Sequence, residues 1–302
     1  MRAEAWAGEA RRVLRERAGI DVVTMTPTRS GESGTAFWIT DRAGAATLLK
    51  IISRPGAAGH LRRVDAVVAR LRDRGYPAPR CRFIGQAADV TFWVQERLPG
   101  SPLEGDHWRP GRAAVTSLLD ELIRLNDAQE GLGDGLPGWP ELITSTLASG
   151  GDGYCVHSTL RDRSDTRDLL AALRRIGERC GPAIAEGSDF VHFDFSFANL
   201  LSDGGAITGV IDVNPPVLAG DRAFDLATLL FYAYDHDDLR TRLLARMLDL
   251  AGLRPCRAYL AHMVLRQVDW SLRQHPDAAI TRRHLGLARL VMSDITDGGP
   301  LS

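Results

Sequence analysis

One stretch, residues 190–234, limits what this chain can fold into more than any other. An apolar run leads into a loop that carries Asp194, and Asn199 follows five residues later. After a turn, a second apolar run ends on Asp212. Oxygen ligands from a loop and a strand end can converge on one point, as Mg²⁺ and a nucleoside triphosphate require. Such residues also simply mark turns, but the spacing and the second strand together favour a phosphate site.

Length and composition indicate an ordinary globular protein. The 302 residues are 44 % hydrophobic and 25 % charged, which fits one large domain or two closely packed ones. The N-terminus lacks the apolar core of a signal peptide, and no apolar run is long enough to span a membrane. Four widely spaced cysteines without a C-x-x-C motif predict reduced thiols in a cytoplasmic protein. They are Cys81, Cys155, Cys180 and Cys256.

Charge is divided unevenly along the chain. Residues 1–98 contain 17 basic and 10 acidic side chains, whereas residues 99–302 contain 20 basic and 28 acidic ones. This asymmetry favours anionic phosphates as partners of the first part and a neutral or cationic ligand for the second. An acidic surface that maintains solubility explains the same counts almost equally well.

Three motifs carry a resemblance to a known family. In order they are His192-x-Asp194-x4-Asn199, Ile211-Asp212 and Gly220-Asp221-x3-Asp225-Leu226-Ala227. This series resembles the aminoglycoside phosphotransferase family, which is related to choline and homoserine kinases and, more distantly, to protein kinases. The likeness is closest over residues 190–230, keeps the right order over residues 28–100, and is only architectural in the last seventy residues.

The resemblance implies an α+β, two-lobed, protein-kinase-like fold. Residues 1–97 would form a nucleotide-binding lobe with an antiparallel sheet, and residues 98–302 a mainly helical lobe for catalysis and acceptor binding. Sequence periodicity predicts helices at 3–18, 58–74, 110–126, 165–180, 225–234, 237–250, 255–274 and 277–293. It predicts strands at 20–28, 36–40, 47–52, 81–86, 90–96 and 206–211. Residues 129–164, rich in Gly, Ser and Asp, are interpreted as a variable excursion near the acceptor site.

Lys50 is the single lysine among 37 basic residues and lies in an apolar strand. A compact ammonium fits between phosphate oxygens where a planar guanidinium does not, so a phosphate-binding role is favoured over a compositional remnant. Members of the resembled family pair this lysine with a glutamate on the next helix. No glutamate occurs here between Glu32 and Glu96, and Asp65 is the nearest acid on that helix.

Two further segments are expected to contact the nucleotide, either ATP or GTP. The loop with Ser30, Gly31 and Ser33 can close over phosphates through backbone N–H groups, although such loops are also common hairpin connections. The resemblance places backbone groups of Glu96 and Leu98 against the nucleobase. Main-chain recognition of this kind leaves the choice of base open.

The resemblance also implies roles for the residues of the first motifs. Asp194 would orient the acceptor hydroxyl and accept its proton, while Asn199 and Asp212 would hold Mg²⁺ across the phosphates. Lys50 would grip the α- and β-phosphates.

Three other polar residues near these motifs are expected to be structural. His192 is predicted to fix the loop through a hydrogen bond to a backbone carbonyl. Asp221 and Asp225 are predicted to bind loop backbone and to cap the following helix.

The acceptor is expected beside the helical lobe. Asp235 and Asp269 could pair with ammonium or guanidinium groups, and Trp270 could pack on a sugar or ring face. A solvated helix start and a core tryptophan are the competing interpretation.

Three functions remain open at this level. The first is an ATP- or GTP-dependent O-phosphotransferase of an antibiotic, favoured by the Arg-, Ala- and Gly-rich composition of a high-GC bacterial genome. The second is a metabolic small-molecule kinase, and the third is a non-catalytic pseudokinase. A protein kinase is not expected, because Asp-Phe-Gly, Ala-Pro-Glu and a long activation segment are all missing. The expected partners are nucleotide and a small hydroxyl compound, without nucleic acid or membrane, in a monomer or homodimer.

Overall fold

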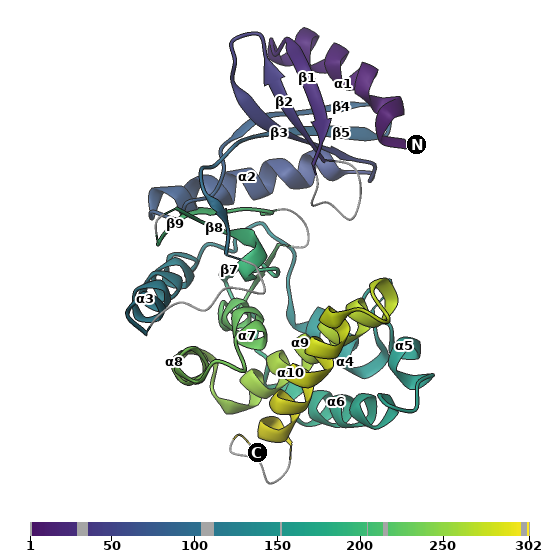
Figure 1. Ribbon diagram of the computed structural model, residues 1–302, viewed down its shortest axis with the longest axis vertical. Coiled ribbons are helices and arrows are strands. Elements are labelled where there is room, and N and C mark those ends of the chain that lie inside the picture. The colour runs from purple at the N-terminus through teal and green to yellow at the C-terminus, as the bar shows by residue number, and fades with distance from the viewer. Residues whose placement is uncertain are drawn as a thin grey trace. The chain divides into compact units, whose positions relative to one another are not determined.

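The chain forms two compact units in a computed structural model (Figure 1). The structure describes residues 2–28, 36–103, 112–151, 153–203, 205–213, 217–296 and 301. The first unit comprises Met1–Ser101 with Leu201–Asn214, and the second comprises Pro102–Leu200 with Pro215–Ser302. The division therefore falls slightly later than the predicted boundary at residue 97, and a later hairpin joins the first unit.

A five-stranded antiparallel sheet forms the centre of the first unit. Its strands stand in the order β1-β2-β3-β5-β4. They are β1 (Val22–Pro27), β2 (Ala36–Asp41), β3 (Ala46–Ile52), β4 (Cys81–Ala87) and β5 (Val90–Glu96). Every strand predicted within residues 20–96 is present. In the register, Lys50 of β3 stands opposite Trp93 of β5.

Two helices belong to this sheet. Helix α1 (Arg2–Ala18) buries Val13 and Leu14 in one core with Phe37 and Leu49 of the sheet, as its apolar stripe predicts (Figure 1). Helix α2 (Ala57–Asp73) packs against β4. The chain leaves α2 through Gly75, whose positive φ of 79° is readily adopted only by glycine.

A small sheet with the order β6-β8-β9 explains why residues 201–214 belong with the first unit. The strands are β6 (Ser101–Pro102), β8 (Leu200–Asp203) and β9 (Ala206–Val210). The Val210 N–H donates to the Pro77 carbonyl at 2.9 Å. The Thr208 hydroxyl donates to the Pro99 carbonyl at 2.7 Å. These bonds attach the hairpin to the segments on either side of β4 and β5.

The second unit is built around one long, largely buried helix, α9 (Leu253–Gln274). It packs against α4, α5, α6, α7, α8 and α10. The helices of this unit are α3 (Arg112–Ala128), α4 (Pro140–Ser149), α5 (His157–Arg161), α6 (Arg167–Cys180), α7 (Ala223–Tyr232), α8 (Asp237–Ala251) and α10 (Ala279–Ile295), beside α9. Short strands β7 (Asp189–Val191) and β10 (Leu218–Gly220) pair antiparallel.

Two of these helices correct the interpretation of residues 129–164 as a variable excursion. The segment contains α4 and α5, and both pack on α9. Trp139, immediately before α4, is fully buried and meets Phe224 edge-on with ring centroids 4.8 Å apart. The segment is therefore part of the core of the second unit. Within the part of the chain that the structure describes, no helix is long and apolar enough to cross a membrane.

Candidate active site

Lys50 lies in β3 between Leu49 and Ile51, both of which are buried in the core. Because strand side chains alternate, the lysine points to the other face of the sheet. There its Nζ forms an ion pair with Oδ1 of Asp212 and lies 5.4 Å from the centre of the Trp93 ring. The lysine side chain is 15 % exposed, whereas that of Asp212 is 44 % exposed. The first unit thus places a cation expected to bind phosphates beside a carboxylate expected to bind Mg²⁺.

Asp212 follows β9 and has a positive φ of 62°. Aspartate adopts this left-handed region more readily than most residues, at a modest conformational cost. The turn aims the side chain at Lys50 rather than along the strand. Backbone strain of this kind concentrates at functional sites, and the role of Asp212 in Mg²⁺ binding stays a prediction.

Asp194 and Asn199 lie together in the second unit. The Asn199 Nδ2 group donates to Asp194 Oδ2 at 2.9 Å and to the Asp194 backbone carbonyl at 2.8 Å. A one-turn 3-10 helix, Phe197–Asn199, brings the amide back to the aspartate. Asp194 remains 37 % exposed, so that a bound molecule can still reach its carboxylate.

Arg266 of α9 completes this arrangement and was not predicted from the sequence. Its Nη2 donates to Asp194 Oδ1 at 2.9 Å, and its Nη1 donates to the Phe193 carbonyl at 2.6 Å. The guanidinium also lies 5.0 Å from the Phe193 ring centre. It is separated from Asp194 by 72 positions and is one of many arginines, so no local pattern marks it.

Asp225, in the first turn of α7, holds the backbone of the loop that carries Asp194. One oxygen accepts the Phe193 N–H at 2.9 Å, and the other accepts the His192 N–H at 2.8 Å and the Gln129 side-chain amide at 2.9 Å. Burial raises the pKa of the Asp225 carboxyl to about 6, an effect that His192 and the surrounding N–H donors partly oppose. These contacts are those of a residue that holds loop backbone, in keeping with its predicted structural role.

His192 and Asp221 also make contacts that hold the local backbone. His192 is buried, and its Nδ1 accepts the Asp194 N–H at 3.3 Å. Asp221 accepts the Ala223 N–H at the start of α7 at 2.9 Å and the Tyr259 hydroxyl at 2.9 Å. Burial raises the pKa of the Asp221 carboxyl above its usual range.

Gly220 shows why the motif Gly220-Asp221 begins with glycine. A Cβ atom at this position would lie 2.6 Å from the Trp139 ring, closer than carbon atoms can approach. The ring would have to move, and Trp139 is fully buried in the core of the second unit. The glycine is therefore a packing requirement of the strand that leads to Asp221.

The remaining residues expected at the nucleotide are placed as follows. Ser30, Gly31 and Ser33 lie outside the described residues. Glu96 ends β5, and its Oε2 accepts the Arg80 N–H at 3.2 Å. The Leu98 side chain lies over Gly209, where an added Cβ would come within 2.8 Å of it.

Asp65 lies in α2, near the Cys81 thiol. Burial is the main cause that raises the pKa of Cys81 to about 11, and the negative charge of Asp65 adds to it. The carboxylate that forms an ion pair with Lys50 is that of Asp212. A role for Asp65 at the nucleotide stays a prediction.

The three residues predicted to bind the acceptor have different surroundings. Asp269 is buried, and Arg273, one turn later in α9, donates to its two oxygens at 2.9 and 2.8 Å. Trp270 is half-buried and meets His275 edge-on at 5.0 Å between ring centres. Asp235 is exposed after α7. Acceptor binding by all three stays a prediction.

The expected Mg²⁺ ligands can be tested on their donor chemistry. The amide nitrogen of Asn199 is engaged by Asp194, which leaves its amide oxygen as the atom for a cation. The amide oxygen of Asn199 in the second unit and the carboxylate of Asp212 in the first unit are each hard oxygen donors of the kind that suits Mg²⁺. Among the described residues, no group of three or more His, Cys, Asp or Glu side chains forms a separate metal cluster.

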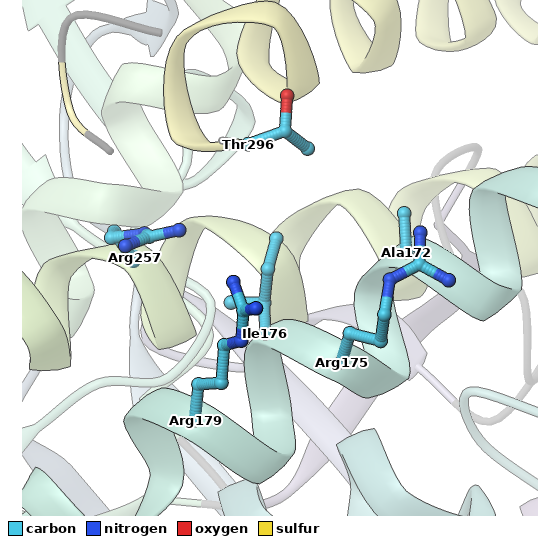
Figure 2. A pocket seen from close by; sticks show the side chains of 6 residues that line it. All are labelled: Ala172, Arg175, Ile176, Arg179, Arg257 and Thr296. Atoms are coloured by element: carbon cyan, nitrogen blue, oxygen red, sulfur yellow. The ribbon is translucent and has the colours of Figure 1, made fainter. Parts of the chain in front are cut away.

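A surface pocket elsewhere in the second unit is lined by none of the predicted site residues. Figure 2 shows side chains of α6 and α9 around it, together with the residue that follows α10. Its lining residues are Ala172, Arg175, Ile176, Arg179, Arg257 and Thr296. Since Asp194 and the other residues expected at the site do not line it, this pocket is distinct from the candidate active site.

Comparisons with known proteins show the family of the chain and support its fold. The model of the phosphotransferase enzyme family (APH) matches residues 24–261. A thermostable mutant of aminoglycoside phosphotransferase APH(4)-Ia has a similar structure, with a TM-score of 0.69 and 21 % identity over 94 % of this chain and 98 % of that one. No curated protein matches the chain in sequence.

Two further structures show the same fold at lower similarity. The GDP and kanamycin complex of APH(2")-IIia gives a TM-score of 0.60 at 15 % identity, over 92 % of this chain and 96 % of that one. A protein from Haemophilus somnus 129PT, assigned as a fructosamine-3-kinase, gives 0.54 at 15 % identity, over 93 % and 96 %. The two-lobed kinase-like fold expected from the sequence is confirmed.

Proposed function

Because the chain belongs to the phosphotransferase enzyme family, we propose that it transfers the γ-phosphoryl group of ATP or GTP to a hydroxyl group of a small molecule. The observation that carries this proposal is the setting of Asp194. Its carboxylate is held by Asn199 and Arg266, yet the side chain remains partly exposed. A fixed and accessible carboxylate is what in-line transfer to a hydroxyl requires.

The proposed step forms one bond and breaks one. The acceptor oxygen bonds to the γ-phosphorus, and the bond from that phosphorus to the β–γ bridging oxygen breaks. The nucleoside diphosphate leaves with that electron pair, and the acceptor hydroxyl proton passes to Asp194 and then to solvent. In a loose transition state the hydroxyl oxygen attacks before it has lost much of its proton, so orientation matters more than strong basicity.

Charge neutralisation comes from the other candidate residues. Lys50 would contact the α- and β-phosphates with its ammonium group. Asn199 and Asp212 would hold Mg²⁺, which supplies positive charge to the phosphate oxygens when it is bound. Backbone groups at Glu96 and Leu98 would receive the nucleobase.

We further propose that the acceptor is an antibiotic and that the protein acts in the cytoplasm. The acidic balance of residues 99–302 would suit a cationic acceptor, such as an aminoglycoside. A metabolic hydroxyl compound is the alternative acceptor, and a pseudokinase that binds without transfer is the alternative function.

The test is an incubation of the purified full chain with Mg²⁺ and γ-labelled ATP or GTP. The panel should contain aminoglycosides, macrolides, nucleoside and peptide antibiotics, choline, homoserine and a fructosamine, with Asp194→Ala as the inactive control. Label transferred to an antibiotic supports the whole proposal, and label on a metabolic compound alone corrects the acceptor. Nucleotide binding without transfer to any acceptor or to water would overturn the enzymatic function.

A further inference from the structure

We infer that Arg266 is a positioning residue for the proposed phosphoryl transfer, so the inference rests on that function. The side chain projects from the middle of α9 and is only 16 % exposed. Its two terminal nitrogens are divided between Asp194 Oδ1, at 2.9 Å, and the Phe193 carbonyl, at 2.6 Å. One rigid, planar group thereby fixes a carboxylate and the peptide carbonyl just before it.

Phe193 needs such support because of its backbone. Its φ is 70°, in the left-handed region that bulky residues rarely adopt. Asp225 holds its N–H at 2.9 Å, and Arg266 holds its carbonyl. The residue before Asp194 is therefore fixed at both ends of its backbone, which sets the direction from which the Asp194 side chain leaves the loop.

Arg266 is itself held by aromatic and neutral groups. Its guanidinium lies 5.0 Å from the centre of the Phe193 ring and 5.9 Å from that of Tyr154. The Tyr154 hydroxyl lies 2.9 Å from His262 Nε2. Burial lowers the pKa of His262 to about 3, so the imidazole is neutral at ordinary pH and adds no charge beside the guanidinium. Stacking on rings restricts the arginine to this orientation.

The arrangement leaves Arg266 a role in geometry rather than in proton transfer. Arginine stays protonated under all ordinary conditions, so it neither gives nor takes the acceptor proton. Asp194 receives one hydrogen bond on each oxygen, from Arg266 and from Asn199, and each oxygen keeps a second lone pair. These two bonds determine where the remaining lone pairs meet an incoming hydroxyl. The amide of Asn199 acts from within the loop, whereas Arg266 ties the loop to the core helix.

The test compares Arg266→Lys, Arg266→Gln and Arg266→Ala with a matched control, Arg257→Gln. Arg257 also lies on α9, is partly buried and donates its Nε to a backbone carbonyl, that of Ile295, at 3.0 Å. The measurements are kcat and nucleotide KM per folded molecule, thermal unfolding, and rescue of Arg266→Ala by guanidinium ion at concentrations that do not denature the wild type. Nucleotide hydrolysis by water serves as the assay if no acceptor is known.

The Arg266→Gln variant is expected to show a kcat lower by about 10²-fold with little change in nucleotide KM, because Asp194 would no longer be held in position. The kcat of Arg266→Lys is expected to lie between that of Arg266→Gln and that of the wild type, since one ammonium cannot donate to both acceptors with the geometry of a guanidinium. Guanidinium should restore part of the kcat of Arg266→Ala, an effect that a loss of folding alone would not produce. The control should keep the wild-type kcat.

Two outcomes would overturn the inference alone. In the first, the wild type is active and kcat per folded molecule stays within about threefold in all Arg266 variants. In the second, kcat falls only in proportion to the folded fraction and guanidinium restores nothing. A wild type that transfers phosphate neither to an acceptor nor to water would instead overturn the proposed function, and the role of Arg266 with it.

Discussion

Lys50 and Asp212 are 162 positions apart in the sequence, and their side chains form an ion pair in the first unit. The pair joins the single lysine of the chain to a carboxylate at the end of β9. In this ion pair the two charges offset one another. A bound nucleotide would offer the ammonium phosphate oxygens, and a cation would offer the carboxylate a new partner.

Lys50→Arg is expected to impair the protein although it keeps the charge. The planar guanidinium is larger than the ammonium and would crowd both Asp212 and the phosphates, and so should raise nucleotide KM or lower kcat. Steady-state kinetics at varied nucleotide concentration test this. Arg82, which is exposed on β4 of the same sheet, provides a control as Arg82→Lys. Wild-type kinetics in Lys50→Arg would indicate that the lysine has no special role.

Asp194→Asn and Asp194→Ala are expected to abolish transfer while nucleotide binding persists. Loss of a positioned base typically lowers the rate by about 10²–10⁴-fold. The asparagine variant also places an amide against Arg266 or Asn199, both of which donate to Asp194. Isothermal titration with nucleotide and a single-turnover assay separate the two effects. A kcat within about tenfold of the wild type would contradict the assignment.

Asp225→Asn is expected to change how stability depends on pH. The folded-state pKa is about 6, raised from 3.8 by burial, so the folded protein binds more protons than the unfolded chain between these values. The contribution of this carboxyl to stability is therefore full below pH 4 and is lost as pH rises through 6.

The measurable quantity is the free energy of unfolding of the wild type minus that of the Asp225→Asn variant. Urea titrations at several pH values should show this difference falling between pH 4 and 6, with a slope approaching about 1.4 kcal/mol per pH unit. The variant should also lose activity, because asparagine has one acceptor oxygen for the N–H groups of His192 and Phe193. A difference that does not vary with pH would disprove the prediction.

The two acidic residues predicted to bind the acceptor are expected to behave differently. Asp269→Asn weakens the pair of a buried carboxylate with the partly exposed Arg273 and should lower Tm, by less than the about 3–5 kcal/mol expected when a fully buried pair loses one partner. Asp235→Asn lies on the surface and should leave Tm unchanged while it raises KM for a cationic acceptor. Thermal unfolding and acceptor kinetics at two salt concentrations distinguish these effects. Unchanged acceptor KM in Asp235→Asn would remove that residue from the acceptor site.

The sequence predicted those features whose signal is local. Helices such as α1 and strands such as β3 follow from apolar periodicity, and residues 190–225 are recognisable from the spacing of a few polar residues. Helices α4 and α5 were missed because they are short and lie among glycines and serines, which favour loops. Burial of Trp139 and packing on α9 outweigh that preference.

The parts of the site that could not be predicted depend on contacts between distant segments. Nothing near Arg266 distinguishes it from the other arginines, and only the fold brings it to Asp194. The pairing of Lys50 with Asp212 is equally non-local, whereas the nearest acid on the expected helix after the lysine strand is Asp65. Residue type and order indicated the chemistry, whereas the hydrogen-bond partners had to come from the three-dimensional structure.

The attachment of residues 201–214 to the first unit affects how the protein could be recombined with a relative. A chimera with a single junction near residue 101 would separate Lys50 from Asp212, because the aspartate would then come from the other parent. In that chimera, the bonds from Val210 to Pro77 and from Thr208 to Pro99 would also join segments from different parents. An exchange of the units that preserves these contacts needs three junctions, near residues 101, 200 and 214. Residues 201–214 then come from the same parent as residues 1–101.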